Sequence, residues 1–419
     1  MMSKESITSS RRTTCRRINR RQFLAGAGAA AVSFTIVQPQ AVHGAEAGAK
    51  LRLGLIGCGG RGTWIGDLFK QHGGYELTAA ADFFQDKVDA FGDKLGVDAS
   101  RRFSGLSSYK RLLESGIDAI AIETPPYFHP EHAAAAVDAG IHVYLAKPIA
   151  VDVWGCKSIQ QSGKKASDKK LCFLVDFQTR VNELFCEAVK RVHNGAIGDF
   201  AFGEATYHAE TLFKDKYKFW QGEQTSPERR LRAWQLDKTL SGDMITEQSI
   251  HALDVASWIM NTEPIQATGT GGRKVRTQAG DIYDCFTLVY EYPNRVGITF
   301  SSRQFDGYGT PEGIRNRMFG SKGVLETEYG GQVLIRGENF YRGGKTTDIY
   351  KQGAVSNIAA FYTNITGGNC ENSTVEPSFR SNLLTILGRT AAYEGRTVKW
   401  DELLKSDQKL EANLTGVKD

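Results

Sequence analysis

The chain has 419 residues, of which 41% are hydrophobic and 24% charged, an ordinary composition for soluble globular proteins and a length sufficient for two domains. Disordered and fibrous classes are excluded on this ground. The formal net charge of +5 arises in the first 47 residues, which hold seven of the 52 Lys and Arg residues and two of the 47 Asp and Glu residues. The remainder carries 45 of each sign, so its charge gives no indication of nucleic-acid binding.

The basic N-terminus has the pattern of an export signal. Residues 19–24, NRRQFL, form a twin-arginine motif, which is followed by a Gly/Ala-rich apolar stretch and a small-residue cleavage site, AEA, at residues 45–47. The apolar stretch is too short and too weakly hydrophobic for a comfortable membrane span. This favours a cleaved signal over an uncleaved anchor or a mispredicted start. We therefore expect residues 1–47 to engage the twin-arginine export machinery and the mature protein to be periplasmic.

A glycine-rich loop follows the first predicted strand, residues 51–56. The loop is GCGGRG at residues 57–62, and a predicted helix comes directly after it. Gly57 allows the tight turn, Gly59 lets the backbone approach a pyrophosphate, and Gly62 lets the helix pack closely on the strand. The helix N-terminus would receive the phosphate charge. The pattern predicts a dinucleotide-binding loop, with Gly60 and Arg61 also beside the cofactor.

An acidic residue completes the dinucleotide pattern. A second predicted strand, residues 75–81, ends at Asp82, which lies twenty residues beyond Gly62. A carboxylate at this place accepts hydrogen bonds from the adenosine ribose hydroxyls. Because it repels a 2′-phosphate, it favours NAD over NADP. The alternative is an acidic turn after a glycine-rich loop.

Strands and helices continue to alternate, as expected for a doubly wound parallel sheet. Ligands bind at the carboxyl ends of such strands, which places Thr124, Pro125, His129 and Lys147 at the cofactor crevice. We therefore predict a Rossmann domain over residues 48–177. Its further elements are expected at 85–95 (helix), 102–103 (strand), 108–115 (helix), 117–122 (strand), 124–129 (strand), 132–139 (helix) and 142–145 (strand).

With these motifs the sequence resembles the Gfo/Idh/MocA oxidoreductases, named after glucose–fructose oxidoreductase and inositol dehydrogenase. The resemblance rests on the glycine loop, Asp82, the TPPYFH loop ending at His129, and the Lys147-Pro148 pair. It extends through a second domain, residues 178–419, to the GRTVKW sequence at residues 395–400. The family implies that this domain is α+β, with a large, mostly antiparallel open sheet. Because such a sheet face needs covering, we expect a homodimer or homotetramer.

The resemblance also implies a catalytic site. In the family the Lys of a Glu-Lys-Pro motif lies beside the nicotinamide, and an Asp-x-x-x-His pair on a helix of the second domain completes the site. The matching residues are Lys147, Glu247 and His251, so this chain departs from the family pattern twice. Ala146 stands where Glu is usual, and Glu247 stands where Asp is usual.

A single helix predicted over residues 242–260 would place Glu247, His251 and Asp254 on one polar stripe. A base that titrates near the working pH suits alcohol oxidation, which favours His251, while Lys147 would polarise the substrate oxygen. Arg180 and Asp254 are expected to contact substrate. An exposed Glu-His pair is the alternative to a site. The stripe could offer ligands to Mn²⁺ or Zn²⁺, but no fourth ligand is evident, so we predict no metal.

These expectations predict an exported NAD-dependent oxidoreductase that acts on a hydroxyl or keto group of a sugar, cyclitol or glycoside. Since nicotinamide cofactors are scarce outside the cytoplasm, we expect the cofactor to stay bound. Two alternatives remain open at this point. One is a redox glycosidase of the same fold, and the other is a non-catalytic sensor of nucleotide or sugar, which the absence of Glu beside Lys147 would favour.

Overall fold

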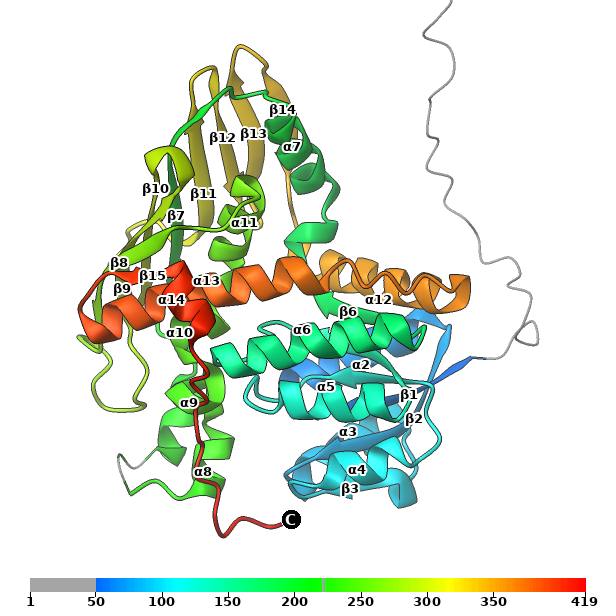
Figure 1. The fold of residues 1–419 in the computed structure, drawn as a ribbon. Coiled ribbons are helices and arrows are strands. Elements are labelled where there is room, and N and C mark those ends of the chain that lie inside the picture. Colours follow the sequence, from blue (N-terminus) through cyan, green and yellow to red (C-terminus); the bar gives the residue numbers. More distant parts are fainter. Residues whose placement is uncertain (1–49, 221, 223) are drawn as a thin grey trace, which may run out of the picture. The chain divides into compact units, whose positions relative to one another are not determined.

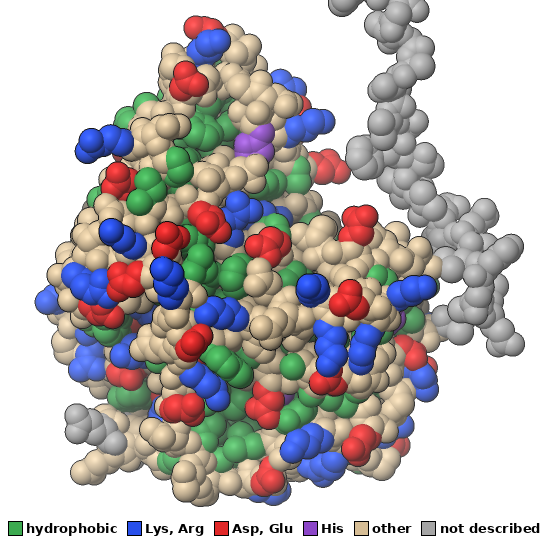
Figure 2. Space-filling model, in the orientation of Figure 1, with side chains coloured by type: hydrophobic (Ala, Val, Ile, Leu, Met, Phe, Trp, Pro, Cys, Tyr) green, Lys and Arg blue, Asp and Glu red, His purple; other side chains and the backbone are tan. Residues whose placement is uncertain are grey.

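A computed structural model describes residues 50–220, 222 and 224–419. The predicted export signal lies outside the described residues. Within the described ranges, no helix combines the length and the apolar character that crossing a bilayer requires. The described residues belong to one compact unit. Figure 2 shows Lys and Arg interspersed with Asp and Glu over the face that it presents.

The N-terminal half is built on a six-stranded, all-parallel sheet in the order β3-β2-β1-β4-β5-β6. This order and the alternation with helices confirm the predicted Rossmann architecture. The strands are β1 (Leu51–Ile56), β2 (Tyr75–Asp82), β3 (Arg102–Ser104), β4 (Ala119–Ile122), β5 (His142–Ala146) and β6 (Phe173–Asp176). The helices between them are α2 (Gly60–His72), α3 (Gln85–Leu95), α4 (Ser108–Leu113), α5 (His129–Asp138) and α6 (Val153–Asp168).

Helices cover both faces of this sheet because successive strand residues point to opposite sides. One buried cluster joins Ile120 and Ile122 of β4 to α4, α5 and α6, and another joins Ala119 and Ala121 to α2 and α3. The second cluster also takes in Ile358 and Phe361 of α12 (Ile349–Gly367), a helix from the C-terminal part of the chain (Figure 1). The sequence patterns did not predict this helix.

The C-terminal half is built on a nine-stranded sheet in the order β14-β13-β12-β11-β7-β10-β9-β8-β15. Only the β7–β10 pair among its described strands is parallel, so the expected large, mostly antiparallel sheet is confirmed. Its strands are β7 (Phe200–Ala209), β8 (Gln266–Gly272), β9 (Cys285–Tyr292), β10 (Val296–Gln304), β11 (Gly313–Gly320), β12 (Gly323–Glu328), β13 (Gln332–Gly337), β14 (Tyr341–Lys345) and β15 (Val398–Lys399).

Helices of this half link the two sheets. The long α13 packs on α6 of the Rossmann half as well as on α11 and β8 (Figure 1). The further helices are α7 (Glu183–His193), α8 (Pro227–Arg232), α9 (Lys238–Ser241), α10 (Asp243–Glu247), α11 (Ile250–Met260), α13 (Val375–Glu394) and α14 (Trp400–Lys405). The predicted division between residues 177 and 178 follows the end of β6 at Asp176, and it stays a prediction.

Two local predictions were wrong. A strand was expected over residues 124–129, but residues 124–128 form turns and residue 129 begins α5, because two consecutive prolines at 125 and 126 cannot join a central ladder. The helix predicted over 242–260 is broken into α10 and α11 at Gln248 and Ser249. This break decides the geometry of the candidate site.

Candidate active site

The glycine-rich loop has the geometry that a dinucleotide requires. Gly57 has a φ of 96°, in the region that favours glycine, and a Cβ there would lie 2.5 Å from the backbone of Glu123. A Cβ at Gly62 would clash with the carbonyl of Gly57. Gly59 and Gly60, in contrast, face open space. Because α2 begins here without a side-chain cap, its first N–H groups are available to a phosphate.

Asp82 fixes the loop to the end of β2. Its carboxylate accepts hydrogen bonds from the backbone N–H groups of Cys58 at 2.7 Å and Phe84 at 2.9 Å. Burial raises the pKa of Asp82, against the effect of these two hydrogen bonds. Each carboxylate oxygen has two lone pairs, so Asp82 keeps acceptor capacity for ribose hydroxyls.

A cavity of about 470 Å³ lies over this loop. It is lined by eight of the ten residues predicted to bind the cofactor, namely Gly57, Gly59, Gly60, Arg61, Gly62, Asp82, Thr124 and Pro125. Its other wall comes from the C-terminal half, from three short helices that we name the cover helices: η3 (Lys214–Phe219), α8, and η4 (Trp234–Leu236). The open loop, the uncapped helix and the acid together fit a nicotinamide dinucleotide.

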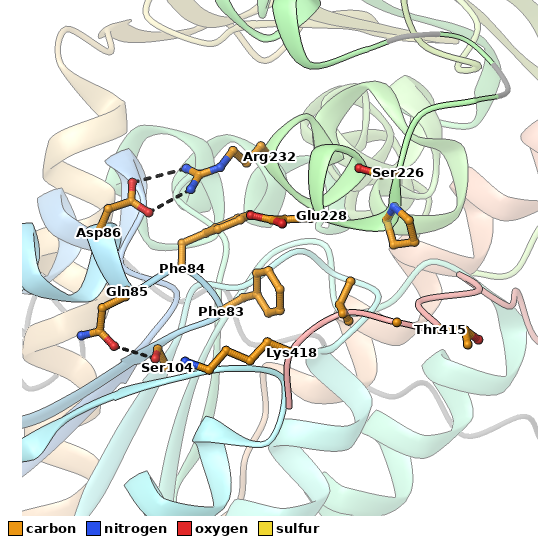
Figure 3. A pocket seen from close by; sticks show the side chains of 13 residues that line it. Phe83, Phe84, Gln85, Asp86, Ser104, Ser226, Glu228, Arg232, Thr415 and Lys418 are labelled. Atoms are coloured by element: carbon orange, nitrogen blue, oxygen red, sulfur yellow. Dashed lines mark hydrogen bonds and ion pairs between the residues drawn. The ribbon is translucent and has the colours of Figure 1, made fainter.

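A second pocket, of about 590 Å³, adjoins this cavity, with which it shares Phe83, Phe84 and Arg232 (Figure 3). Arg232 of α8 forms an ion pair with Asp86 at 2.9 Å and lies 3.8 Å from the ring centroid of Phe84. The opposite wall is the C-terminal tail, residues 406–419, through Thr415 to Lys418. The Rossmann half is thus joined to the cover helices at the rim of the cavity.

His129 is held between two backbone segments, and its predicted position beside the cofactor stays a prediction. Its two ring nitrogens each lie 2.8 Å from a backbone carbonyl oxygen, those of Pro148 and Thr124. Burial lowers the pKa of His129 to about 4. The ring therefore lies between the loop after β4 and the Lys147-Pro148 segment, whose peptide bond is cis. Like Lys147, it is not among the residues that line the cavity.

Lys147 and Glu247, a hundred residues apart, are brought together. Lys147 Nζ donates a 2.6 Å hydrogen bond to the backbone carbonyl of Glu247 and lies 3.6 Å from its Oε1. The break after α10 explains this contact. The carbonyl of Glu247 accepts a hydrogen bond from Lys147 in place of the backbone N–H that a continuous helix would supply from its next turn. Burial lowers the pKa of Lys147, as does Arg61, while Glu247 opposes the shift.

His251 lies in the same neighbourhood, on the first turn of α11. Only 8% of the residue is exposed, and its Nδ1 is buried without a hydrogen-bonding partner among the described residues. Burial lowers the pKa of His251 well below its ordinary value, and the charges of Lys147 and Arg61 lower it further. The imidazole is therefore neutral. A buried nitrogen without a partner costs free energy unless a ligand supplies one, which favours a binding site here.

Arg180 and Asp254 are paired with each other. The guanidinium donates from Nε at 2.9 Å and from Nη2 at 2.8 Å to the buried carboxylate, which also accepts from Ser381 at 2.7 Å. The pair fastens the segment after β6 to α11 and α13. The structure explains both residues as a structural ion pair, and their predicted contact with substrate stays a prediction.

Two acidic residues of the site were missed by the sequence reasoning. Glu123 directly follows β4 and Asp176 ends β6, and both side chains form ion pairs with Arg61. A signal for them existed, because an acid at the end of an apolar parallel strand is at the same kind of position as Lys147. Tyr329 was also missed, and its ring centroid lies 5.5 Å from that of His251.

Fold and cavity together define an NAD-binding oxidoreductase of the Rossmann type. The family model described as "Oxidoreductase family, NAD-binding Rossmann fold" matches residues 51–174, and the model of the "GFO/IDH/MocA C-terminal domain" matches residues 185–326. The chain belongs to the Gfo/Idh/MocA family.

The chain is also similar to individual named proteins. Myo-inositol 2-dehydrogenase of Thermotoga maritima is 23% identical over 367 residues, covering 84% of this chain and 100% of the relative. A glycosyl hydrolase family 109 protein of Streptomyces coelicolor is 29% identical over 175 residues, covering 40% of this chain and 36% of the relative. The structure of an aldose-aldose oxidoreductase of Caulobacter crescentus covers 84% of this chain and 100% of its own, with 20% identity and a TM-score of 0.65.

Proposed function

We propose that the protein oxidises or reduces a CH–OH or keto group of a sugar, cyclitol or glycoside by hydride transfer with NAD. The observation that carries this proposal is the convergence of Lys147, Glu247 and the unpartnered Nδ1 of His251. The inositol and aldose substrates in the names of two similar proteins support the substrate class. NAD bound over the glycine loop would supply the hydride acceptor.

Each of the three side chains has a distinct role in the proposed reaction. The ammonium group of Lys147 donates a hydrogen bond to the substrate oxygen and holds it. His251, neutral in this environment, accepts the hydroxyl proton during oxidation and returns it during reduction. Glu247 lies beside Lys147, and its role is to hold a second hydroxyl of the substrate. Its carboxylate contacts Lys147 and accepts a hydrogen bond from Gln248, and no described hydrogen bond joins it to His251, which argues against a role in fixing the imidazole tautomer.

We further propose that the protein retains its cofactor. The cover helices form one wall of the cavity, and the C-terminal tail braces them. In the tail, the carbonyl of Ala412 accepts a 2.6 Å hydrogen bond from Arg230 of α8, and the carbonyl of Lys418 accepts one from Leu106 of the Rossmann half. Retention suits the predicted periplasmic location, where free nucleotide is scarce. Heat release of much less than about one nucleotide per chain from freshly isolated protein would count against it.

A redox glycosidase is the second candidate function. The similarity to the glycosyl hydrolase family 109 protein favours it, although that similarity covers 40% of this chain. The two functions differ in net chemistry. A glycosidase with a retained cofactor releases a free sugar from a glycoside without added NAD, whereas a dehydrogenase produces a stoichiometric keto product.

An oligomer remains part of the proposal. Ion pairs such as Arg315–Glu328 and Arg317–Glu204 cross one face of the nine-stranded sheet, and Phe202, 44% exposed, stacks on Phe319 there. An open face of this size favours association into a dimer or tetramer. Sedimentation equilibrium of the mature chain tests this point.

The test of the function is a screen for turnover. Nucleotide released by heat is identified first, and native protein is then mixed with inositols, aldoses and glycosides while the reduced nicotinamide is measured. Reduction by at least one substrate in the native protein, and its loss in Lys147→Met, is the expected result. Turnover unchanged in both Lys147→Met and His251→Ala would exclude the proposed site.

A further inference from the structure

The environment of Ala146 contains two buried carboxylates from the neighbouring strands. β5 lies between β4 and β6, and the register pairs Ile122 with Leu145 and Ala146 with Asp176. Glu123 therefore lies beside Ala146 on one side and Asp176 on the other. Both acidic side chains are fully buried. The chain thus lacks a carboxylate at position 146 but has one on either side of it.

Arg61 connects these two acids. From the first turn of α2 its Nε lies 3.0 Å from Glu123 Oε2, and its Nη2 donates to Asp176. Its Nη1 donates a 2.8 Å hydrogen bond to the hydroxyl of Tyr350 on α12. The guanidinium is held from three elements, so its charge is fixed at the inner end of the cofactor cavity.

Asp176 and Glu123 differ in the hydrogen bonds that their carboxylates accept. Asp176 accepts hydrogen bonds from Arg61 and, at 2.7 Å, from Asn357 of α12. Glu123 has its ion pair with Arg61, but neither of its carboxylate oxygens has a hydrogen-bonding partner among the described residues. Glu123 also lines the cavity, whereas Asp176 does not. Of the two, Glu123 is therefore the carboxylate that borders the cofactor cavity.

The charges facing Glu123 are those of Arg61, Lys147 and Asp176, and the phenol of Tyr144 lies near them. Burial raises the pKa of Glu123 to about 7, with Asp176 adding to the shift and Arg61 and Lys147 opposing it. With Glu123 ionised, the site holds the carboxylates of Glu123, Asp176 and Glu247 against two cations, a formal charge of −1. Glu123 thereby pairs with Arg61, one of the two cations that lower the pKa of His251.

We propose that Glu123 is a positioning residue of this site, whose ionised carboxylate supplies through Arg61 and Lys147 the negative charge that Ala146 does not provide. This inference rests on the function proposed above. Its physical content is that alcohol oxidation needs Glu123 ionised, whereas a purely structural ion pair would leave the pH dependence of turnover unchanged.

The first test is the pH profile of oxidation. In the native protein kcat/KM should rise with pH through about 7 as Glu123 loses its proton. In Glu123→Gln this rise, the acidic limb of the pH profile, should vanish. At pH values above about 7, kcat/KM of this variant should be at least about tenfold lower than in the native protein, because one full charge is lost from a buried site. Glu123→Asp, which keeps the charge, should retain the limb. Adding Ala146→Glu to Glu123→Gln should restore it.

A second readout does not depend on turnover. Oxidised nicotinamide is cationic and reduced nicotinamide is not, so Glu123→Gln should weaken NAD⁺ relative to NADH by about tenfold in calorimetric titration of stripped protein. Asp118→Asn is the matched control, because Asp118 precedes the opposite end of β4 and pairs with Arg52. This variant should leave both the pH limb and the affinity ratio unchanged.

The outcomes separate the inference from the proposed function. If the native protein binds NAD and turns over, but Glu123→Gln keeps the same limb and the same affinity ratio, the role of Glu123 is refuted and the function stands. If the native protein binds no nicotinamide nucleotide, both are refuted. If Glu123→Gln does not fold, Ala146→Glu alone provides the test. In that variant the rise of kcat/KM should occur at higher pH, because a further carboxylate raises the pKa of Glu123. If the rise of kcat/KM in Ala146→Glu occurs at the same pH as in the native protein, the inference is overturned.

Discussion

Replacing Arg180 by Met separates a structural role of the Arg180–Asp254 pair from a role in substrate binding. The carboxylate of Asp254 is fully buried, and Arg180 Nη2 lies 2.8 Å from its Oδ1. At this distance an effective dielectric constant of about 20 gives an attraction of about 6 kcal/mol. Part of this attraction offsets the desolvation of both charges. Arg180→Met, which leaves Asp254 buried with Ser381 as its remaining partner, should lower the free energy of unfolding by about 3–5 kcal/mol.

Denaturant unfolding followed by circular dichroism measures this loss, and the double variant Arg180→Met/Asp254→Leu is its control. With both charges removed, no buried charge is left unpaired, so most of the stability should return. The KM of any substrate should stay near that of the native protein in the double variant. The reasoning is refuted if Arg180→Met unfolds like the native protein while KM rises, because the pair would then serve substrate binding.

Three further predictions address the site and the cofactor. His251→Ala should lower kcat by at least about 100-fold with little effect on NAD binding, measured by steady-state kinetics and calorimetry, since a general base contributes on this order. Asp82→Ala should raise the affinity for NADP relative to NAD, because the ribose carboxylate that repels a 2′-phosphate is gone; an unchanged ratio in competitive titration would contradict that role. Deleting residues 407–419 removes the tail contacts to Arg230 and Leu106. This truncation should speed nucleotide dissociation in a stopped-flow chase, and an unaltered rate would show that the tail does not hold the cofactor.

Local patterns were sufficient to predict the Rossmann half. The glycine spacing at residues 57–62 and the acid at 82 are dictated by backbone geometry within some thirty residues, so the sequence shows them directly. Lys147 could be placed by the same logic, because parallel strands direct their carboxyl ends to one edge. The mostly antiparallel sheet of the second half was expected from the family resemblance and a few alternating strands.

What the sequence did not show depends on partners far apart in the chain. The helix break after Glu247 accompanies the bond from its carbonyl to Lys147, which lies a hundred residues earlier. The pairing of Arg180 with Asp254 spans 74 residues, and α12 reaches back to Asp176 through Asn357. Helical periodicity detects neither kind of contact. The sequence does show Glu123 directly after a strand, but it does not show that this carboxylate pairs with the guanidinium of Arg61.

The most direct measurement of the central claim is the formation of reduced nicotinamide by native protein mixed with a panel of cyclitols, aldoses and glycosides, with Lys147→Met and His251→Ala alongside. The account predicts that at least one of these alcohols reduces the cofactor, bound or added, and that both variants lose this activity while keeping their nucleotide. Native protein that binds no nicotinamide nucleotide, or variants that turn over as fast as the native protein, would contradict it.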